Sequence, residues 1–351
     1  MRNKNFKWQL PISIVMLVLV ALCGLLLAYC SGVKPIFYLI LIPSAFLLVQ
    51  ITALFHEFGH YIATAKNGFE VYFFKFSCFT IDKFGRKKIR LSLFNKHLGE
   101  IRFYPKNEGK HSDNFLKSLH GGLIGNLLVA IILNTLLLLS VLGAFKGASP
   151  YMTLAFAFSP YALYSYLINV IPWFHPENDG SQIKRIKASE KERQAIDNLY
   201  NVQKLLFDGK TYEEIPKGYF NADASVSEVI KTTLTFYALK RAIELEDCES
   251  AGALATVLEN AEFTDDEIWC ELLSFYVMQG DSKKIEEYSS VLSFNANSND
   301  PTVFRAILSY AKYRGDNEYL KVATPTFIKL CENAKMCKGD ALYNLKLIKR
   351  L

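Results

Sequence analysis

Residues 36–65 read IFYLILIPSAFLLVQITALFHEFGHYIATA, a stretch of thirty positions with no lysine or arginine and one carboxylate. Such a stretch is long enough to cross a hydrocarbon core about 30 Å thick. It contains His56-Glu57-Phe58-Gly59-His60, so three ionisable side chains lie within five residues. Ionisable groups at membrane depth are energetically expensive and are typical of functional sites. This stretch therefore predicts both a membrane span and the place where the chain does its chemistry.

Three further apolar stretches complete a prediction of about four spans, at 8–29, 115–145 and 151–174. Basic residues precede the first stretch, as they do in a signal peptide. A cleaved signal peptide would have a shorter apolar core followed by a cleavage site of small residues. This run is longer and ends in Tyr29-Cys30-Ser31-Gly32, which favours a retained span. The fold class expected is a multi-pass α-helical membrane protein.

The loops between these stretches predict the orientation. Residues 66–117 hold 12 Lys+Arg and 5 Asp+Glu, whereas the opposite loops contain only Lys34 and Lys146. By the positive-inside rule, both termini and the 66–117 loop are cytoplasmic. The Lys-, Asn- and Phe-rich composition, without organelle signals, indicates a bacterial plasma membrane.

The charge balance changes near residue 180. Residues 1–180 hold 17 Lys+Arg and 8 Asp+Glu, and the remainder holds 23 and 26, which together give the net charge of +6. With 51% hydrophobic residues, this composition excludes a disordered chain and a small disulfide scaffold. A nucleic-acid partner is not expected, because the positive charge lies in the more apolar half. We expect a membrane domain at 1–187 and a cytoplasmic domain at 188–351.

Two regions outside the spans have patterns of their own. Residues 69–105 are rich in aromatic and β-branched residues and predict a small β-hairpin or sheet, the alternative being a basic loop that faces lipid. The C-terminal domain predicts helices throughout, and its two Gly-Asp turns lie 35 residues apart. This spacing is near that of tetratricopeptide-type arrays, which bind a peptide or protein partner, although an irregular bundle is the alternative. The predicted helices cover 190–207, 226–244, 247–260, 265–279, 282–293, 300–314, 316–334 and 338–350.

The candidate chemistry begins with the histidine pair. His56 and His60 are four residues apart, so on a helix both imidazoles project from one face and can share a metal ion. Glu57 beside them can accept a proton from water. A catalytic zinc site needs a third protein ligand, and acidic residues are scarce in this half. Glu177 and Asp179 follow the fourth stretch. In the expected topology the second and fourth spans run in the same direction, so these two acids lie at a depth similar to that of His56 and His60.

In this combination and order, His56 to His60 followed by Asn169, Pro172, Asp179 and Gly180 resembles the site-2 protease family of intramembrane zinc metalloproteases. The run Gly122-Leu123-Ile124-Gly125-Asn126 is similar to a further element of that family on the intervening helix. The resemblance implies one catalytic Zn²⁺ held by His56, His60 and Asp179, with Glu57 as general base. It also implies that Asn169 holds the substrate or the developing oxyanion, and that the substrate is a membrane-anchored protein or peptide in the lipid bilayer.

Some features depart from the family pattern. Asp179 follows Asn169 by ten positions instead of about eight, which leaves His175 and Glu177 as alternative third ligands. The 66–110 segment is too short for the PDZ domain that many relatives carry, so the C-terminal domain is a candidate control element. The altered spacing also leaves open a pseudoprotease that binds clients without cutting them. A zinc transporter is disfavoured, because it should distribute polar residues through several spans.

Glycines and the remaining histidines and cysteines complete the sequence predictions. Gly121, Gly122 and Gly125 predict close helix packing around the site. Apart from His175, no role is assigned to the histidines and cysteines outside the motif, which are His97, His111, His120, Cys23, Cys30, Cys78, Cys248, Cys270, Cys331 and Cys337.

Overall fold

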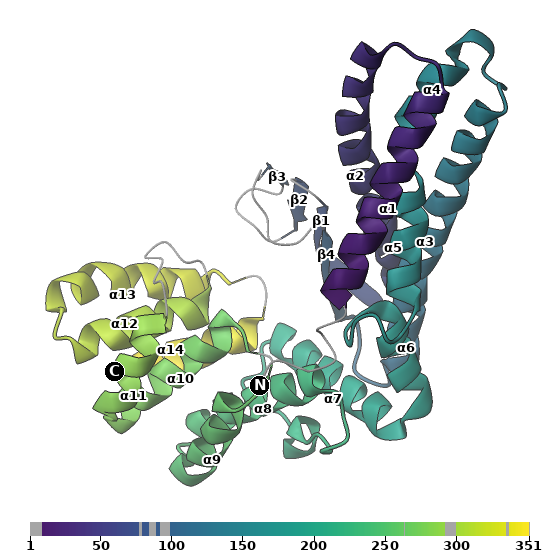
Figure 1. The fold of residues 1–351 in the computed structure, drawn as a ribbon. Coiled ribbons are helices and arrows are strands. Elements are labelled where there is room, and N and C mark those ends of the chain that lie inside the picture. The colour runs from purple at the N-terminus through teal and green to yellow at the C-terminus, as the bar shows by residue number, and fades with distance from the viewer. Residues whose placement is uncertain are drawn as a thin grey trace. The chain divides into compact units, whose positions relative to one another are not determined.

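The computed structural model describes residues 9–76, 79–83, 89–91, 99–262, 264–291, 300–334 and 337–350. The chain is mostly helical and divides into two compact units (Figure 1). The first unit consists of Met1–Tyr104 and Ser112–Ser189, and the second consists of Pro105–His111 and Glu190–Leu351. Each unit contains its own clusters of buried apolar side chains.

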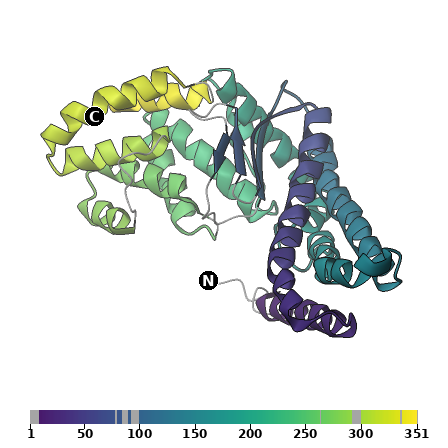
Figure 2. The same ribbon diagram turned by 90° about the horizontal axis from the view of Figure 1, so that it is seen from above.

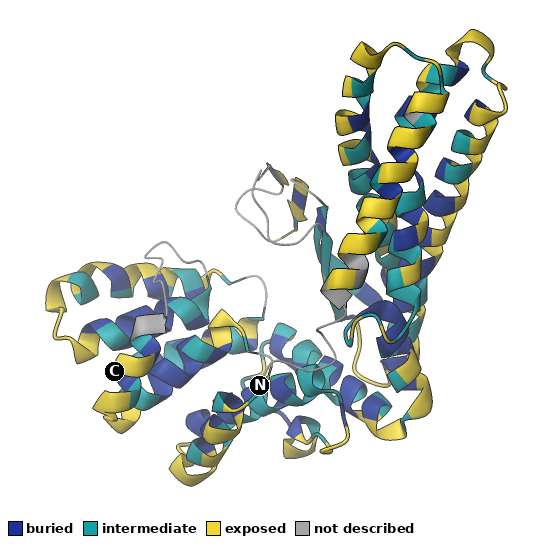
Figure 3. Ribbon diagram, viewed as in Figure 1, coloured by how far each residue is buried: buried dark blue, intermediate teal, exposed yellow. Residues whose placement is uncertain are grey.

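The first unit contains the apolar helices. These are α1 (Gln9–Cys30), α2 (Leu41–Lys66), which a 3-10 helix (Pro35–Ile40) precedes, and α3 (Ser112–Val141). Two helical stretches, Pro35–Lys66 and Ser112–Val141, are long and apolar enough to cross a membrane. Large apolar side chains lie exposed along the outer faces of all three helices (Figure 3). An exposed apolar surface of this extent is typical of a face that contacts lipid or a partner.

The fourth expected span, 151–174, is not one helix. It is divided into α4 (Ser149–Phe156) and α5 (Pro160–Val170), with Ala157–Ser159 between them. Pro160 has no backbone N–H, and its ring would clash with the carbonyl of Phe156 in a continuous helix. Hydropathy alone does not register this effect, so the apolar stretch did not predict the break. After α5 the chain turns and begins α6 (Asp179–Ala188).

The expected sheet is present between α2 and α3 in the chain. It has the strand order β3-β2-β1-β4, with β1 (Phe69–Phe76), β2 (Phe79–Asp82), β3 (Ile89–Leu91) and β4 (Gly99–Pro105). β1 and β2 pair antiparallel with Phe73 opposite Asp82, and β2 pairs antiparallel with β3. β4 therefore lies at one edge of this sheet. His97 and Cys78 lie outside the described residues.

The second unit is helical, as expected, and its helices begin and end at local signals. Asp281 accepts a hydrogen bond from the backbone N–H three residues later, and Asp316 does the same, so each caps a helix. Each follows a glycine with positive φ, Gly280 or Gly315, that ends the preceding helix. The helices are α7 (Glu190–Phe207), α8 (Glu228–Glu244), α9 (Cys248–Glu259), α10 (Asp266–Gln279), α11 (Ser282–Val291), α12 (Pro301–Tyr313), α13 (Asn317–Glu332) and α14 (Lys338–Ile348), with a short 3-10 helix at Lys217–Phe220.

A buried group of charges connects four of these helices. Lys240 of α8 is 2.8 Å from Asp340 of α14, and Arg305 of α12 is 2.7 Å from Glu271 of α10. The hydroxyl of Tyr343 donates to Glu271 at 2.6 Å. Lys240, Arg305 and Glu271 are almost completely inaccessible to solvent. Because buried charges are tolerated only when they are paired and hydrogen-bonded, this group fixes how the helices meet.

Candidate metal centre

α2 and α3 lie side by side and bring their backbones into contact (Figure 2). A Cβ atom added at Gly59 would collide with the carbonyl of Gly121, and one added at Gly121 would collide with the carbonyl of Gly59. Glycine at both positions therefore permits a crossing closer than side chains would allow. This contact confirms the prediction of close packing at Gly121. It also places main-chain carbonyls of α3 within reach of side chains on α2.

Two carbonyls of α3 orient the two histidines of α2. The Nδ1 of His56 lies 3.2 Å from the carbonyl oxygen of Gly122, and the Nδ1 of His60 lies 2.8 Å from that of Ser118. A carbonyl oxygen can only accept, so each Nδ1 carries the proton and donates it. Each Nε2 is then left with a lone pair. Metal-binding histidines are held in this way by their second nitrogen.

Gly122 has a second role beside the histidines. A Cβ atom at this position would overlap the imidazole of His60. Only glycine therefore lets the carbonyls of α3 and the ring of His60 take their observed positions. Ser118 and Gly122 are four residues apart, as are the histidines that donate to them.

The third member of the group, Asp179, is the first residue of α6. Asn178 fixes the start of this helix, because its Oδ1 accepts from the N–H of Ser181 at 2.8 Å. The Nδ2 of Asn178 donates to the carbonyls of Ile168 at 2.6 Å and Ile171 at 2.9 Å, which ties α6 to the end of α5. Asp179 is buried, and among the described residues its Oδ2 accepts no hydrogen bond.

Three lone-pair atoms converge at this place. The Nε2 atoms of His56 and His60 are 3.2 Å apart, and the Oδ2 of Asp179 lies 3.7 Å from the first and 3.4 Å from the second. Ligand atoms about 2.0–2.2 Å from a tetrahedral zinc ion lie about 3.3–3.6 Å apart. Three acceptors with no donor between them repel one another unless a cation binds among them. The donor set therefore fits a zinc ion held by two imidazoles and one carboxylate, with a fourth position available.

Glu57 lies on the same turn of α2 but outside this group of three. Its carboxyl group packs against the start of β4, where a Cβ atom on Gly99 would overlap it. Among the described residues, the side chain of Glu57 forms no hydrogen bond or ion pair. Its carboxylate is therefore available to exchange a proton with water.

The alternative ligands and Asn169 are engaged elsewhere. Glu177 pairs with Arg185 at 3.1 Å, and His175 is exposed, with its Nδ1 accepting from the N–H of Glu177 at 3.0 Å. The amide of Asn169 donates to the carbonyl of Ser165 within its own helix at 3.0 Å. Of the three candidate ligands that follow α5, only Asp179 lies with His56 and His60.

Several positions that shape the site were not predicted from the sequence. Ser118 orients His60 through its main-chain carbonyl. Every residue has such a carbonyl, so the side chain at this position could not predict the contact. Asn178 could have been predicted as a helix cap, because Asn before a polar helix start is typical of one. By contrast, Asn126 was noted in the sequence as the last residue of the run that begins at Gly122. It is fully buried, and neither polar atom of its side chain has a hydrogen-bond partner among the described residues.

Comparison of the chain with protein-family models, curated protein sequences and solved structures finds no match. The metal centre is therefore inferred from the arrangement of its side chains.

Proposed function

We propose that this protein is an intramembrane zinc metalloprotease of the site-2 protease type, which hydrolyses peptide bonds within or near transmembrane segments of membrane-anchored proteins or peptides. The observation that carries the proposal is the convergence of His56, His60 and Asp179, whose ligand atoms lie within 4.8 Å of one another. Two of these residues lie on a helix that is long and apolar enough to cross a membrane. Ionisable residues at membrane depth are typical of functional sites, and a metal ion held there would lie beside a membrane-embedded substrate.

The residues around the site have distinct roles in this proposal. His56, His60 and Asp179 would hold Zn²⁺, which supplies a water that ionises near neutral pH and a Lewis acid that polarises a peptide carbonyl. Glu57 accepts the proton of the attacking water and returns it to the leaving amine. Asn169 contributes its amide to the substrate or to the developing oxyanion, which requires that it exchange its present bond to Ser165.

In the membrane, α1, α2 and α3 each cross once, and α4 with α5 completes the fourth crossing. Both termini then lie on the cytoplasmic side of a bacterial plasma membrane, as the basic loops indicate. The exposed apolar faces of α1, α2 and α3 support this placement, because they would contact lipid (Figure 3). The polar end of α2 and the start of α6 then lie at the cytoplasmic side.

A substrate helix must unwind before its peptide bonds can be attacked, because they are already hydrogen-bonded within the helix. β4 offers an edge that can receive an unwound segment as an added strand. Its first residue, Gly99, touches the side chain of Glu57, so a strand bound there would begin beside the general base. The helical second unit would bind a protein partner and control access.

The proposal can be tested with the full-length protein in lipid nanodiscs. We expect about one zinc ion per chain in the wild type and in Glu57→Gln, and a large loss in Asp179→Ala. Glu70→Gln, a change at an acid in β1 that pairs with Lys83, is the matched control. In cells that naturally express the protein, membrane proteomics of Glu57→Gln should show an accumulated single-span protein.

Two results would contradict parts of this proposal. Zinc bound by the wild type without any accumulated client in Glu57→Gln would favour the pseudoprotease alternative, which the unusual spacing of Asn169 and Asp179 suggests. Unchanged zinc content in Asp179→Ala would remove Asp179 as a ligand.

A further inference from the structure

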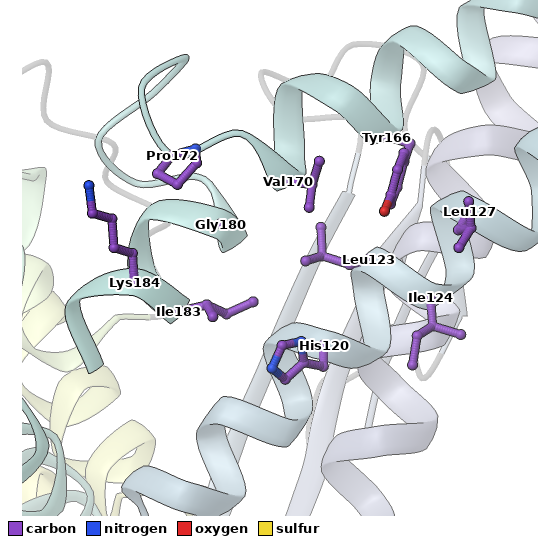
Figure 4. A pocket seen from close by; sticks show the side chains of 10 residues that line it. All are labelled: His120, Leu123, Ile124, Leu127, Tyr166, Val170, Pro172, Gly180, Ile183 and Lys184. Atoms are coloured by element: carbon purple, nitrogen blue, oxygen red, sulfur yellow. The ribbon is translucent and has the colours of Figure 1, made fainter. Parts of the chain in front are cut away.

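A pocket of about 410 Å³ lies on the other side of α3 from the metal centre, between α3, α5 and α6 (Figure 4). Its wall is mainly apolar: Leu123 and Ile183 point towards each other across it, and Val170 points into the same space. Gly180, the residue after Asp179, forms part of this wall. The lining residues are His120, Leu123, Ile124, Leu127, Tyr166, Val170, Pro172, Gly180, Ile183 and Lys184.

The walls of this pocket suit a narrow occupant. Leu123 and Ile183 face each other across it (Figure 4), whereas an α-helix with its side chains is about 10–12 Å across. A single extended apolar chain requires much less width. Ile124 and Leu127, which line the pocket, are exposed on the outer face of α3, so a chain can enter from the lipid side.

The two ends of the pocket differ in polarity. Ile124, Leu127 and Tyr166 lie towards one end, and His120 and Lys184 lie towards the other (Figure 4). Lys184 is exposed and forms no ion pair or hydrogen bond with any residue that the structure describes. Its ammonium group is therefore free to bind an anion. Lys187, one turn further along α6, adds a second positive charge.

We propose that this pocket binds one acyl chain of an anionic phospholipid, with the phosphate held by Lys184. In the proposed membrane topology the polar end faces the cytoplasmic leaflet, where anionic headgroups attract basic side chains. The proposal rests on that topology and not on proteolytic activity. The bound lipid would stabilise the start of α6, because it contacts Gly180 beside the ligand Asp179.

The test measures lipid retention, which does not require a substrate. The full-length Glu57→Gln protein is prepared in nanodiscs of equal phosphatidylglycerol and phosphatidylcholine, transferred to detergent and analysed by native mass spectrometry. We expect retained phosphatidylglycerol to exceed phosphatidylcholine by about tenfold. Leu127→Trp, which fills the apolar end, and Lys184→Gln, which removes the charge, should each reduce this retention at least fivefold.

Two matched variants serve as controls. Leu128→Trp places the same bulk on the neighbouring residue of α3, which is exposed but does not line the pocket, and Lys66→Gln removes an exposed lysine from the end of α2. Both should retain phosphatidylglycerol like the parent protein. Equal retention of the two lipids, or unchanged retention in Leu127→Trp, would overturn the proposal. Because the test measures lipid retention in Glu57→Gln, which lacks the proposed general base, failure of the proposed protease function would leave this result unaffected.

Discussion

Asn201 of α7 and Gly109 exchange two hydrogen bonds. The Nδ2 of Asn201 donates to the carbonyl of Gly109 at 3.0 Å, and its Oδ1 accepts from the N–H of Gly109 at 2.8 Å. Asp197, one turn earlier on α7, accepts from the N–H of His111 at 2.6 Å. The segment Pro105–His111 connects β4 to α3 in the chain, yet it is held by a helix of the second unit. Side chains of α7 therefore fix the connection that follows the edge strand of the sheet.

Replacing Asn201 should loosen this connection. Two hydrogen bonds contribute about 1–3 kcal/mol together, which corresponds to a roughly 5- to 150-fold change in local opening. We therefore expect amide hydrogen exchange in residues 105–111 to accelerate by at least about fivefold in Asn201→Ala. Asn198→Ala is the matched control, because Asn198 lies on the same helix and donates to the carbonyl of Asn221 instead. Equal acceleration in both variants would show that α7 as a whole had become unstable.

The same segment should respond to pH through His111. Burial lowers the pKa of His111, and contacts with Asn201 and Asp197 only partly oppose this shift. The folded state therefore binds fewer protons than the unfolded state just below the ordinary histidine pKa of about 6.5. The stabilisation from neutral His111 is complete above that value and decreases as the pH falls through it.

We expect exchange protection of residues 105–111, corrected for the intrinsic effect of pH, to be lower at pH 5.5 than at pH 7.5. In His111→Gln the difference between the two pH values should shrink, with peptides from α10 as the internal reference. A difference of the same size in His111→Gln would assign the pH dependence to other groups.

The buried charges of the second unit give a prediction about stability. Burial alone would lower the pKa of Lys240, but Asp340 and Glu271 raise it above its usual value, so the side chain remains charged. Lys240→Ala would leave those carboxylates without their partner in an apolar interior, and we expect the free energy of unfolding to fall by about 3–5 kcal/mol. Urea-dependent hydrogen exchange in α10 and α12 of the full-length protein measures this loss.

The control for this variant is Lys204→Ala, which removes the pairing of Lys204 with Asp208, the residue that follows α7. Such pairs contribute about 0.3–0.5 kcal/mol, so little change is expected. If the two lysine variants had similar stability, the buried charges would not be important for holding the helices together.

Local signals in the sequence predicted much of this structure. The helices of the second unit were predictable because turns such as Gly280-Asp281 carry both a helix end and a helix cap. The pairing of His56 with His60 followed from their spacing on a helix. Both features depend on residues close together in the chain, for which backbone geometry is nearly fixed.

Features that depend on distant contacts could not be predicted in this way. The assignment of Pro105–His111 to the second unit depends on Asn201 and Asp197, some 90 residues away. Glu177 pairs with Arg185 and is therefore not a metal ligand in this structure. The sequence could not predict this pairing, because either residue could have paired with another charge. The break before Pro160 was predictable in principle, but the apolar character of 151–174 concealed it.

The last prediction concerns Gly122, which lies against His60 and whose carbonyl orients His56. Gly122→Ala would push the imidazole of His60 away from its hydrogen bond with Ser118. Because loss of an orienting contact typically weakens metal binding by about 10–100-fold, we expect a decrease of that size in zinc affinity, measured by competition with a chelator. Gly147→Ala is the control, since no atom lies within 4 Å of its added Cβ. Circular dichroism should show equal helix content in both variants, and unchanged zinc affinity in Gly122→Ala would mean that the histidine geometry is not what holds the metal.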